Sequence, residues 1–261
     1  MTGSGADAAL DELAATPRLL AALDFDGTLS PLENEPMDAR MLPAARDAVE
    51  ALVALPDTFV ALVSGRSLTD LRVIAEHDDD SGIRLAGSHG AEFWIPGEGR
   101  VEPADDAADV ELRDRLRADA ERVTSDLDGV WIEPKTFGFG VHTRRADPAA
   151  AHTANRRVDR IVAAEAPHWR RRTGHNIVEF SFRHEGKDSA VAALRERTRA
   201  TAVLFAGDDV TDEDALRSLA AGDVGVHVGT GPTAARVLVA DIPAMAEFLA
   251  DLARRRAALR A

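Results

Sequence analysis

Two carboxylates that could do chemistry lie near the start of the chain, at Asp24 and Asp26. They follow the apolar residues 19–23 and precede Gly27 and Thr28, in the stretch LLAALDFDGTLS. An apolar run of this length that ends in a glycine turn predicts a buried strand. Ligands bind beyond the carboxyl ends of such strands, so the position suits a site. Burying two acids there without a cation or strong hydrogen bonds would be costly.

Taken alone, the Asp24/Asp26 pair could be only a turn followed by a helix cap. Other polar groups follow predicted strands or begin a predicted helix: Ser64-Gly65-Arg66 after residues 58–63, Lys187 at the start of 187–197, and Asp208-Asp209 after 202–206. Each has an ordinary alternative as a helix start, a solvated lysine or a cap. Gathered at one edge of one sheet, they favour a metal-assisted phosphoryl site.

The residue types fit that chemistry. Mg²⁺ prefers oxygen ligands, which the carboxylates of Asp24 and Asp208 can supply. Asp24 is also a candidate nucleophile, because carboxylates form aspartyl-phosphate intermediates. Asp26 could protonate the leaving oxygen and later deprotonate water. The metal, Lys187 and hydroxyl or backbone donors near Ser64 would offset the charge on the transferring group.

Elements that could position these groups alternate between strand and helix at both ends of the chain, which is the doubly wound α/β signature. Besides those above, we expect helices at 42–55, 68–77, 232–237 and 243–259, strands at 83–86 and 224–228, and a helix cap at Thr211 with Asp214. We expect residues 1–18 to be a polar segment that precedes the first strand and contains at most one helix. The Pro/Gly/Asp-rich stretch 96–109 reads as a linker between domains.

An α+β segment interrupts this core. Its expected elements are helix 110–127, strands 130–133 and 137–143, helix 148–166, and strands 168–172 and 176–182. The order αββαββ predicts a small antiparallel sheet covered by two helices.

Composition narrows the function classes. Across 261 residues, 45 acids outnumber 31 bases for a net charge of −14, which disfavours nucleic-acid binding. There is no cysteine, so disulfide and thiol chemistry are excluded. No apolar run suggests a membrane span, and the start of the chain lacks the pattern of a signal peptide. We therefore expect a cytoplasmic protein without a membrane partner.

In combination, DFDGT, SGR, the isolated Lys187 and GDDVTDED resemble the four motifs of the haloacid dehalogenase (HAD) superfamily of phosphatases. LDFDGTLSPL, LVSGRSLTDL, GSHGAEFW, VHTR and FAGDDVTDEDAL further resemble the trehalose-6-phosphate phosphatase family across nearly the whole chain. The resemblance implies an α/β fold: a doubly wound parallel-sheet HAD core, residues 1–100 and 184–261, with an inserted α+β cap domain (αββαββ), residues 101–183. It implies hydrolysis of trehalose 6-phosphate to trehalose and phosphate with Mg²⁺.

The resemblance also assigns roles to residues. It makes Asp24 the nucleophile, Asp26 the acid/base, and Ser64 and Lys187 the phosphoryl-binding residues. Mg²⁺ would be held by Asp24, the Asp26 carbonyl and Asp208. Residues expected close to the phosphate and the metal are Thr28, Gly65, Arg66, Asp209 and Asp212. Cap residues that match sugar-binding positions are Glu133, Lys135, His142 and Glu179. The alternative is that each of these is only an exposed residue of a strand.

Two departures from the family pattern stand out. Asp188 follows Lys187 where the family usually has glycine, and it could weaken phosphate binding or cap the helix, with Ser189 as a rival cap. The chain also has no tyrosine. Neither departure touches the nucleophile, the acid/base or the metal ligands.

Two other functions compete with this prediction. The chain could act on another sugar phosphate, such as sucrose phosphate, a hexose phosphate or glucosylglycerol phosphate, because the cap decides the substrate. It could instead be a non-catalytic regulatory partner of a trehalose-6-phosphate synthase, although the intact set of motifs argues against this. We expect a monomer that binds a small sugar phosphate, and leave a synthase partner open.

Overall fold

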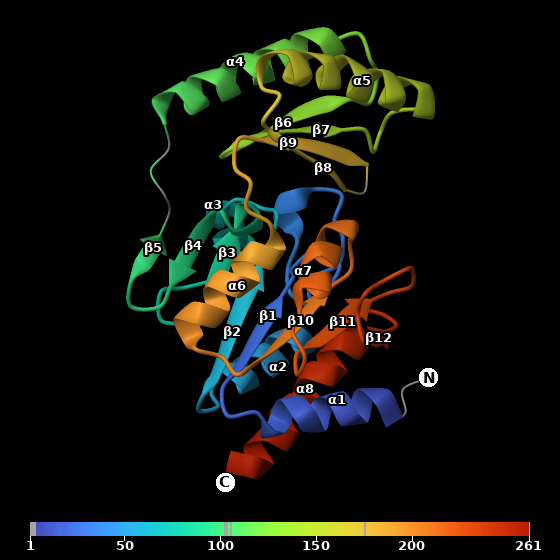
Figure 1. Ribbon diagram of the computed structural model, residues 1–261. Coiled ribbons are helices and arrows are strands. Elements are labelled where there is room, and N and C mark those ends of the chain that lie inside the picture. The colour runs from blue at the N-terminus through green and yellow to red at the C-terminus, as the bar shows by residue number, and fades with distance from the viewer. Residues whose placement is uncertain (1–3, 102–103, 105, 175, 261) are drawn as a thin grey trace. The chain divides into compact units, whose positions relative to one another are not determined.

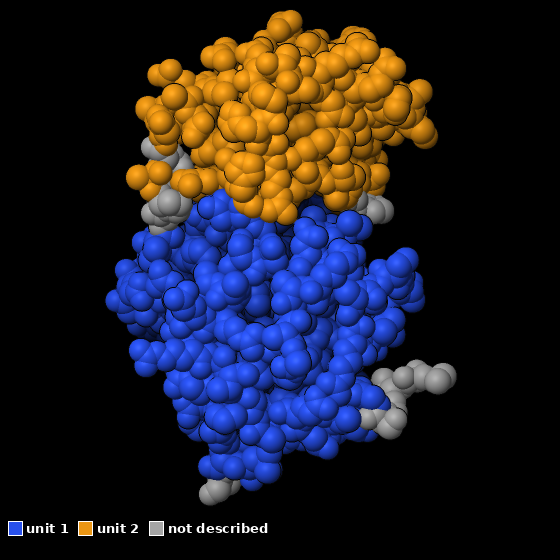
Figure 2. Space-filling model, viewed as in Figure 1, with its two compact units in different colours: residues 1–102, 185–261 blue, residues 103–184 orange. Residues whose placement is uncertain are grey.

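The computed structural model describes residues 4–101, 104, 106–174 and 176–260. The chain forms two compact units, coloured separately in Figure 2. Unit 1 comprises Met1–Glu102 and Glu185–Ala261, and unit 2 comprises Pro103–His184. The predicted insertion at 101–183 overlaps unit 2. Among the described residues, no helix is long and apolar enough to cross a membrane.

Unit 1 is built on one eight-stranded sheet of order β12-β11-β10-β1-β2-β3-β4-β5 (Figure 1). Its strands are β1 (Leu19–Leu23), β2 (Thr58–Val63), β3 (Arg84–Gly87), β4 (Glu92–Ile95), β5 (Gly99–Val101), β10 (Ala202–Gly207), β11 (Val224–Val228) and β12 (Val237–Val239). The strands from β12 to β3 pair in parallel, and β4 and β5 add an antiparallel hairpin at the edge. Because β1 lies between β10 and β2, the loops that follow these three strands meet at one edge.

Helices cover both faces of this sheet, which explains why β1 is apolar throughout. The helices of unit 1 are α1 (Ser4–Ala15), α2 (Pro43–Val53), α3 (Leu68–Ile74), α6 (Lys187–Thr198), α7 (Glu213–Ser218) and α8 (Ile242–Arg260). Leu19, Ala21 and Leu23 pack in a core with α1, α2, α3 and α8, whereas Leu20 and Ala22 pack in a second core with α6 and α7. A strand buried on both faces holds its carboxyl end rigidly.

Several expected elements differ from the structure. The stretch 96–109 was expected to be a linker, but residues 99–101 form β5, because the turn at Gly97 and Gly99 folds the chain back onto β4. The helix predicted at 232–237 is wrong, because Val237–Val239 instead extends the sheet as β12. Within residues 1–18, which were expected to be only a polar segment, α1 buries Leu13 completely and is therefore part of the core.

The predicted helix cap at Thr211 is also wrong. Thr211 lies inside the short 3-10 helix η3 (Val210–Asp212), and Asp209 is the residue that precedes this helix. The side chain of Asp212 turns back to accept a hydrogen bond from the backbone N–H of Asp209. The turn after β10 therefore begins two residues earlier than the Thr211–Asp214 pattern indicated.

Unit 2 has the expected order αββαββ. Its elements are α4 (Ala107–Thr124), β6 (Trp131–Lys135), β7 (Gly138–His142), α5 (Pro148–Glu165), β8 (Arg170–Gly174) and β9 (Ile177–Ser181). The strands form an antiparallel sheet of order β6-β7-β9-β8, with α4 and α5 on one face (Figure 1). Phe139 and Phe180 are paired across β7 and β9 and are buried, so this unit has an aromatic core of its own.

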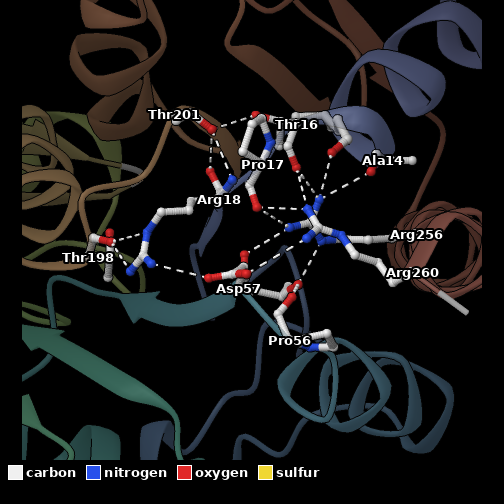
Figure 3. A network of polar contacts seen from close by, with 12 residues as sticks. Ala14, Thr16, Pro17, Arg18, Pro56, Asp57, Thr198, Thr201, Arg256 and Arg260 are labelled. Carbon is white, nitrogen blue, oxygen red and sulfur yellow. Dashed lines mark hydrogen bonds and ion pairs between the residues drawn. The ribbon is translucent and has the colours of Figure 1, made fainter.

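The amino end of β1 is held by a buried arginine from α8 (Figure 3). Arg256 donates to the carbonyls of Leu13 and Ala14 in the last turn of α1, which have no partner within that helix. It also donates to the carbonyl of Thr16 at 2.7 Å and to the hydroxyl of Thr58 at 2.6 Å. None of its described hydrogen bonds goes to a carboxylate.

Burial lowers the pKa of Arg256 to about 10, and the neighbouring charge of Arg260 acts in the same direction. Backbone dipoles therefore carry most of the compensation for this guanidinium. Arg260 donates to the carbonyls of Thr16 and Pro17, and Arg18 donates to Thr198 and Asp57 in the same network. These contacts join α1, β1, β2 and α8 at the edge of the sheet opposite the polar loops.

We predict that Arg256→Met lowers the free energy of unfolding by about 2–4 kcal/mol, because several buried carbonyls lose their donor while the cost of burying a charge is relieved. Urea unfolding of the purified protein measures this. Arg254→Met is the matched control, because Arg254 is exposed on the same helix, and it should change stability by less than about 0.5 kcal/mol. Equal stability of the two variants would contradict the assignment.

Candidate active site

Three acidic side chains gather at the carboxyl edge of the unit 1 sheet. Ligand atoms of Asp24, Asp208 and Asp212 all lie within 4.8 Å of one another. Asp24 follows β1 and donates its backbone N–H to the carbonyl of Ala206 in β10, which places it beside the strand that Asp208 follows. The adjacency of β1 and β10 therefore brings together two motifs that are 184 residues apart in the sequence.

Lys187 lies between two of these acids. Its Nζ donates to Asp24 Oδ1 and to Asp212 Oδ1, both at 2.6 Å, and all three side chains are buried. Lys187 is the first residue of α6, and the Ser189 hydroxyl rather than Asp188 accepts the N–H of Gly186 to cap that helix. The expected helix start at Lys187 is confirmed.

The charges of this cluster are out of balance. Burial raises the pKa of Asp24 well above its ordinary value. The charge of Lys187 lowers this pKa, and the charge of Asp212 raises it further. Burial, together with the charge of Asp212, raises the pKa of Asp208 to about 6. Burial by itself would lower the pKa of Lys187, but Asp212 and Asp24 outweigh it and raise that pKa. When all three carboxylates are ionised, their charge exceeds that of the one ammonium by two.

A divalent cation would supply the missing charge. The cluster offers carboxylate oxygens, the ligands that Mg²⁺ prefers. Asp24 and Asp208, both in the predicted metal set, belong to it. Asp212 belongs to it as well, although it is already bonded to Lys187 and to the N–H groups of residues 208 and 209. The donor set therefore fits the expected metal, with Asp212 fixing the turn that presents Asp208.

Two glycines leave room for these carboxylates. A Cβ at Gly27, whose φ is +79°, would lie 2.1 Å from an oxygen of Asp208. A Cβ at Gly207 would lie 2.2 Å from the carboxyl carbon of Asp212. Thr28 is buried, and its hydroxyl lies 3.4 Å from oxygens of both Asp24 and Asp208.

The loop after β2 brings the other predicted residues to this edge. Ser64 is buried, and its hydroxyl accepts the backbone N–H of Arg66 at 3.1 Å. Gly65 has no space for a side chain, because a Cβ there would lie 2.7 Å from the ring of His89. The guanidinium of Arg66 pairs with the carboxylate of Asp26 at 2.6 Å. This Arg66–Asp26 pair was not anticipated.

A buried glutamate that sequence reasoning did not single out supports that loop. Glu92 in β4 is fully buried and accepts the backbone N–H of Leu68 at 2.8 Å and the hydroxyl of Ser88 at 2.7 Å. Arg100 pairs with its other oxygen. The sequence hints at it with an acid within the otherwise apolar AEFWI, a position that a buried strand does not accept without partners, and the quoted motif GSHGAEFW contains the same residue.

The predicted sugar-binding residues lie together on unit 2. Cross-strand pairing places Glu133 and Glu179 on either side of Gly140, on the face of the sheet that alternates with the Phe139–Phe180 core. Glu133 Oε2 contacts Lys135 Nζ at 2.9 Å and His142 Nε2 at 2.6 Å.

This group is a connected polar network. Lys135 Nζ also lies 3.5 Å from Glu179 Oε1. The ring of His142 stacks on Trp131 with centroids 4.5 Å apart. Burial alone would raise the pKa of Glu133, but the His142 hydrogen bond and the charge of Lys135 outweigh it and lower that pKa. Glu133 therefore accepts two hydrogen bonds as an ionised group.

Comparisons with known proteins identify the family of this chain. A family model described as trehalose-phosphatase matches residues 22–238. The chain belongs to the trehalose-phosphatase family. A trehalose-phosphate phosphatase of Mycobacterium tuberculosis is 34% identical over 256 residues, which cover 91% of this chain and 62% of that protein. An uncharacterized glycosyl hydrolase of the same organism is 32% identical over 219 residues, which cover 79% of this chain and 16% of that protein.

This chain thus spans less than two thirds of the length of these relatives. Among solved structures, the C-terminal domain of the C. albicans trehalose-6-phosphate phosphatase superposes with a TM-score of 0.82 at 21% identity, covering 97% of each chain. A sugar phosphatase of HAD subclass IIB has a TM-score of 0.58 at 16% identity, covering 88% of this chain and 96% of the other. These likenesses confirm the expected HAD fold with an inserted cap.

We predict that Asp212→Ala lowers the free energy of unfolding by about 3 kcal/mol, because it removes one partner of a buried pair. The relief of repulsion with Asp208 keeps the loss at the low end of the range for such pairs. Thermal and urea unfolding measure it in metal-free buffer. Asp214→Ala, at an exposed position two residues away, is the control and should have little effect. A loss no larger than the control's would show that Asp212 does not hold the cluster.

Proposed function

We propose that this chain is a Mg²⁺-dependent phosphatase that hydrolyses trehalose 6-phosphate to trehalose and phosphate. The observation that supports it most is the buried Asp24–Lys187–Asp212 group with Asp208 beside it, in a member of the trehalose-phosphatase family. A regulatory protein without catalysis has no need to keep an excess of buried negative charge, which lowers stability unless a cation binds.

In the proposed reaction Asp24 attacks the phosphorus atom, and its position supports this role. One oxygen of Asp24 is held by Lys187 at 2.6 Å, and the other lies 3.4 Å from the hydroxyl of Thr28. Lys187 thereby orients the nucleophile and, with the hydroxyl of Ser64, would stabilise charge on the transferring phosphoryl group. Mg²⁺, held by Asp24, Asp208 and the Asp26 carbonyl, would neutralise charge on the phosphate.

Asp26 is proposed as the acid/base for both half-reactions. In the first, its proton passes to the leaving sugar oxygen as the phosphorus–oxygen bond breaks. In the second, it takes a proton from the water that attacks the aspartyl phosphate, which restores the carboxylate of Asp24. Asp26 is two residues from the nucleophile and is not part of the buried acidic cluster, so one loop can present two carboxylates in different roles.

Sugar recognition is proposed for the polar network of Glu133, Lys135, His142 and Glu179. A disaccharide is recognised through its hydroxyl groups, which need fixed donors and acceptors, and such sites reject analogues that lack the matching hydroxyl. The network provides carboxylates, an ammonium and an imidazole on one face of a sheet. We further propose that the protein is cytoplasmic and acts as a monomer.

The decisive experiment is phosphate release from a panel of sugar phosphates, with Mg²⁺ and with chelator. We expect trehalose 6-phosphate to have the highest kcat/KM, chelator to abolish turnover, and Asp24→Asn to reduce it at least about 10⁴-fold, because the nucleophile is lost. Preference for sucrose phosphate or a hexose phosphate would keep the chemistry and reject the substrate. No release from any substrate would favour the regulatory function.

We also expect Glu133→Gln to lower kcat/KM for trehalose 6-phosphate about 10–100-fold and to leave hydrolysis of p-nitrophenyl phosphate within about twofold, since only the first substrate carries the hydroxyls. Glu165→Gln, an exposed position on α5, serves as the control on the same unit. Equal losses on both substrates would mean that Glu133 does not contact the sugar.

A further inference from the structure

The candidate acid/base is held by an arginine in the loop that follows β2. Arg66 Nε donates to Asp26 Oδ2 and Arg66 Nη2 donates to Asp26 Oδ1, both at 2.6 Å. Both side chains are mostly buried, at 18% and 23% exposed. A guanidinium that meets a carboxylate through two parallel hydrogen bonds fixes the plane of the carboxylate as well as its distance.

Arg66 is itself held by its surroundings. Its Nη1 donates to the carbonyl of Pro36 at 2.7 Å, in the short helix η1 (Pro36–Asp38), and its backbone N–H donates to the Ser64 hydroxyl. The arginine therefore joins the connection between β1 and α2, at both Asp26 and Pro36, to the loop that follows β2. From the sequence, Arg66 was expected only close to the phosphate and the metal. Since most of its donors are engaged within the protein, Arg66 is better placed to orient Asp26 than to bind the phosphate.

The backbone around Asp26 is fixed separately. The N–H of Gly27 donates to the carbonyl of Ser30, and the N–H groups of Leu29 and Ser30 both donate to the carbonyl of Phe25. These contacts set the course of the loop but leave the side-chain torsions of Asp26 undetermined. The Arg66 pair is the described contact that selects its orientation.

We propose that Arg66 is the positioning residue for the acid/base Asp26, an inference that rests on the proposed phosphatase function. A carboxylate has about four lone-pair positions, and the arginine uses one on each oxygen. One of the other two carries the proton that passes to the leaving sugar oxygen, and it then accepts a proton from the attacking water. Arg66 acts through Asp26 and does not touch the reacting phosphorus atom.

The consequence differs between the two half-reactions. Cleavage of a sugar phosphate needs a proton on the leaving oxygen, whereas nitrophenolate leaves without one. Hydrolysis of the aspartyl phosphate needs Asp26 as a base whichever substrate formed it. A misplaced Asp26 therefore slows both steps with trehalose 6-phosphate, but only the second step with p-nitrophenyl phosphate.

The test compares Arg66→Met and Arg66→Lys in the Mg²⁺-loaded protein. For trehalose 6-phosphate, we expect Arg66→Met to lower kcat about 10–100-fold with KM within about twofold, the loss typical of a displaced catalytic group. Arg66→Lys should recover part of kcat, because lysine keeps the charge but not the paired geometry. With p-nitrophenyl phosphate, Arg66→Met should give a rapid release of one nitrophenolate per enzyme followed by slow turnover, and acid quenching should trap more phosphoprotein than in the wild type.

The control is Arg236→Met. Arg236 makes a similar paired contact with Glu12, but it precedes β12 and so lies at the opposite edge of the sheet. It should leave kcat and the burst unchanged. A rise in KM for both substrates without loss of kcat would overturn the proposal and assign Arg66 to phosphate binding. An equal loss of kcat on both substrates without a burst, accompanied by a fall in melting temperature, would overturn it in favour of a purely structural role.

The outcomes separate this inference from the proposed function. If the wild type does not hydrolyse trehalose 6-phosphate but does hydrolyse p-nitrophenyl phosphate, the substrate assignment fails while the burst still tests Arg66. If the wild type forms no aspartyl phosphate on any substrate, the phosphatase function and the role of Arg66 fail together.

Discussion

The site in unit 1 depends on the contact of one buried ammonium with two buried carboxylates. Lys187, Asp24 and Asp212 come from three separate segments, and each would be costly to bury alone. Together they satisfy one another through hydrogen bonds of 2.6 Å. The chain leaves unit 1 at residue 102 and re-enters it at residue 185. Lys187 lies only two residues after this re-entry, so its contact with Asp24 joins the start of the second segment to the end of β1.

Strand β1 is held by cations at both ends, and the two ends are compensated differently. At its amino end, Arg256 is surrounded by backbone carbonyls, whose dipoles satisfy a guanidinium without removing its charge. At its carboxyl end, Lys187 faces full negative charges that exceed its own. The charge at the amino end is therefore compensated within the protein, whereas the carboxyl end has an affinity for further positive charge. This asymmetry explains how a rigid, fully buried strand can carry the proposed nucleophile, Asp24.

Local sequence patterns predicted much of this arrangement. Apolar runs and their boundaries predict a helix that begins at Lys187 and buried strands that are followed by Asp24, Ser64 and Asp208. The edge of the sheet that carries the site could therefore be deduced from the order of elements. The hairpin of β4 and β5 could not, because Gly/Pro-rich residues that turn between strands have the composition of a linker. The strand at 237–239 was missed for a similar reason, since three residues are too few to show a period.

Side-chain partners across the sheet could not be predicted from the sequence, for another physical reason. The pairing of Arg66 with Asp26 and the burial of Glu92 depend on which strands are neighbours and on the rotamers that packing allows. Asp212 was expected only as a nearby carboxylate. Its central position arises because its two oxygens serve different partners, Lys187 on one side and the turn after β10 on the other. A sequence indicates that an acid is present, but not how its lone pairs are divided.

The two groups of polar site residues lie on different units, and each unit has its own hydrophobic core. In unit 2, Phe139 and Phe180 stabilise the sheet from the helix side, so Glu133 and Glu179 on the other face carry little of the fold's stability. Between them lies Gly140, which contributes no side chain to that face. In the proposed function, substitutions there would alter which hydroxyls are bound, whereas the positions of Asp24 and Lys187 are determined by a different sheet. A change in the buried trio instead alters charge balance and stability at once. Under the proposed function, substrate preference would therefore be free to vary, whereas the phosphoryl chemistry would be constrained by the fold of unit 1.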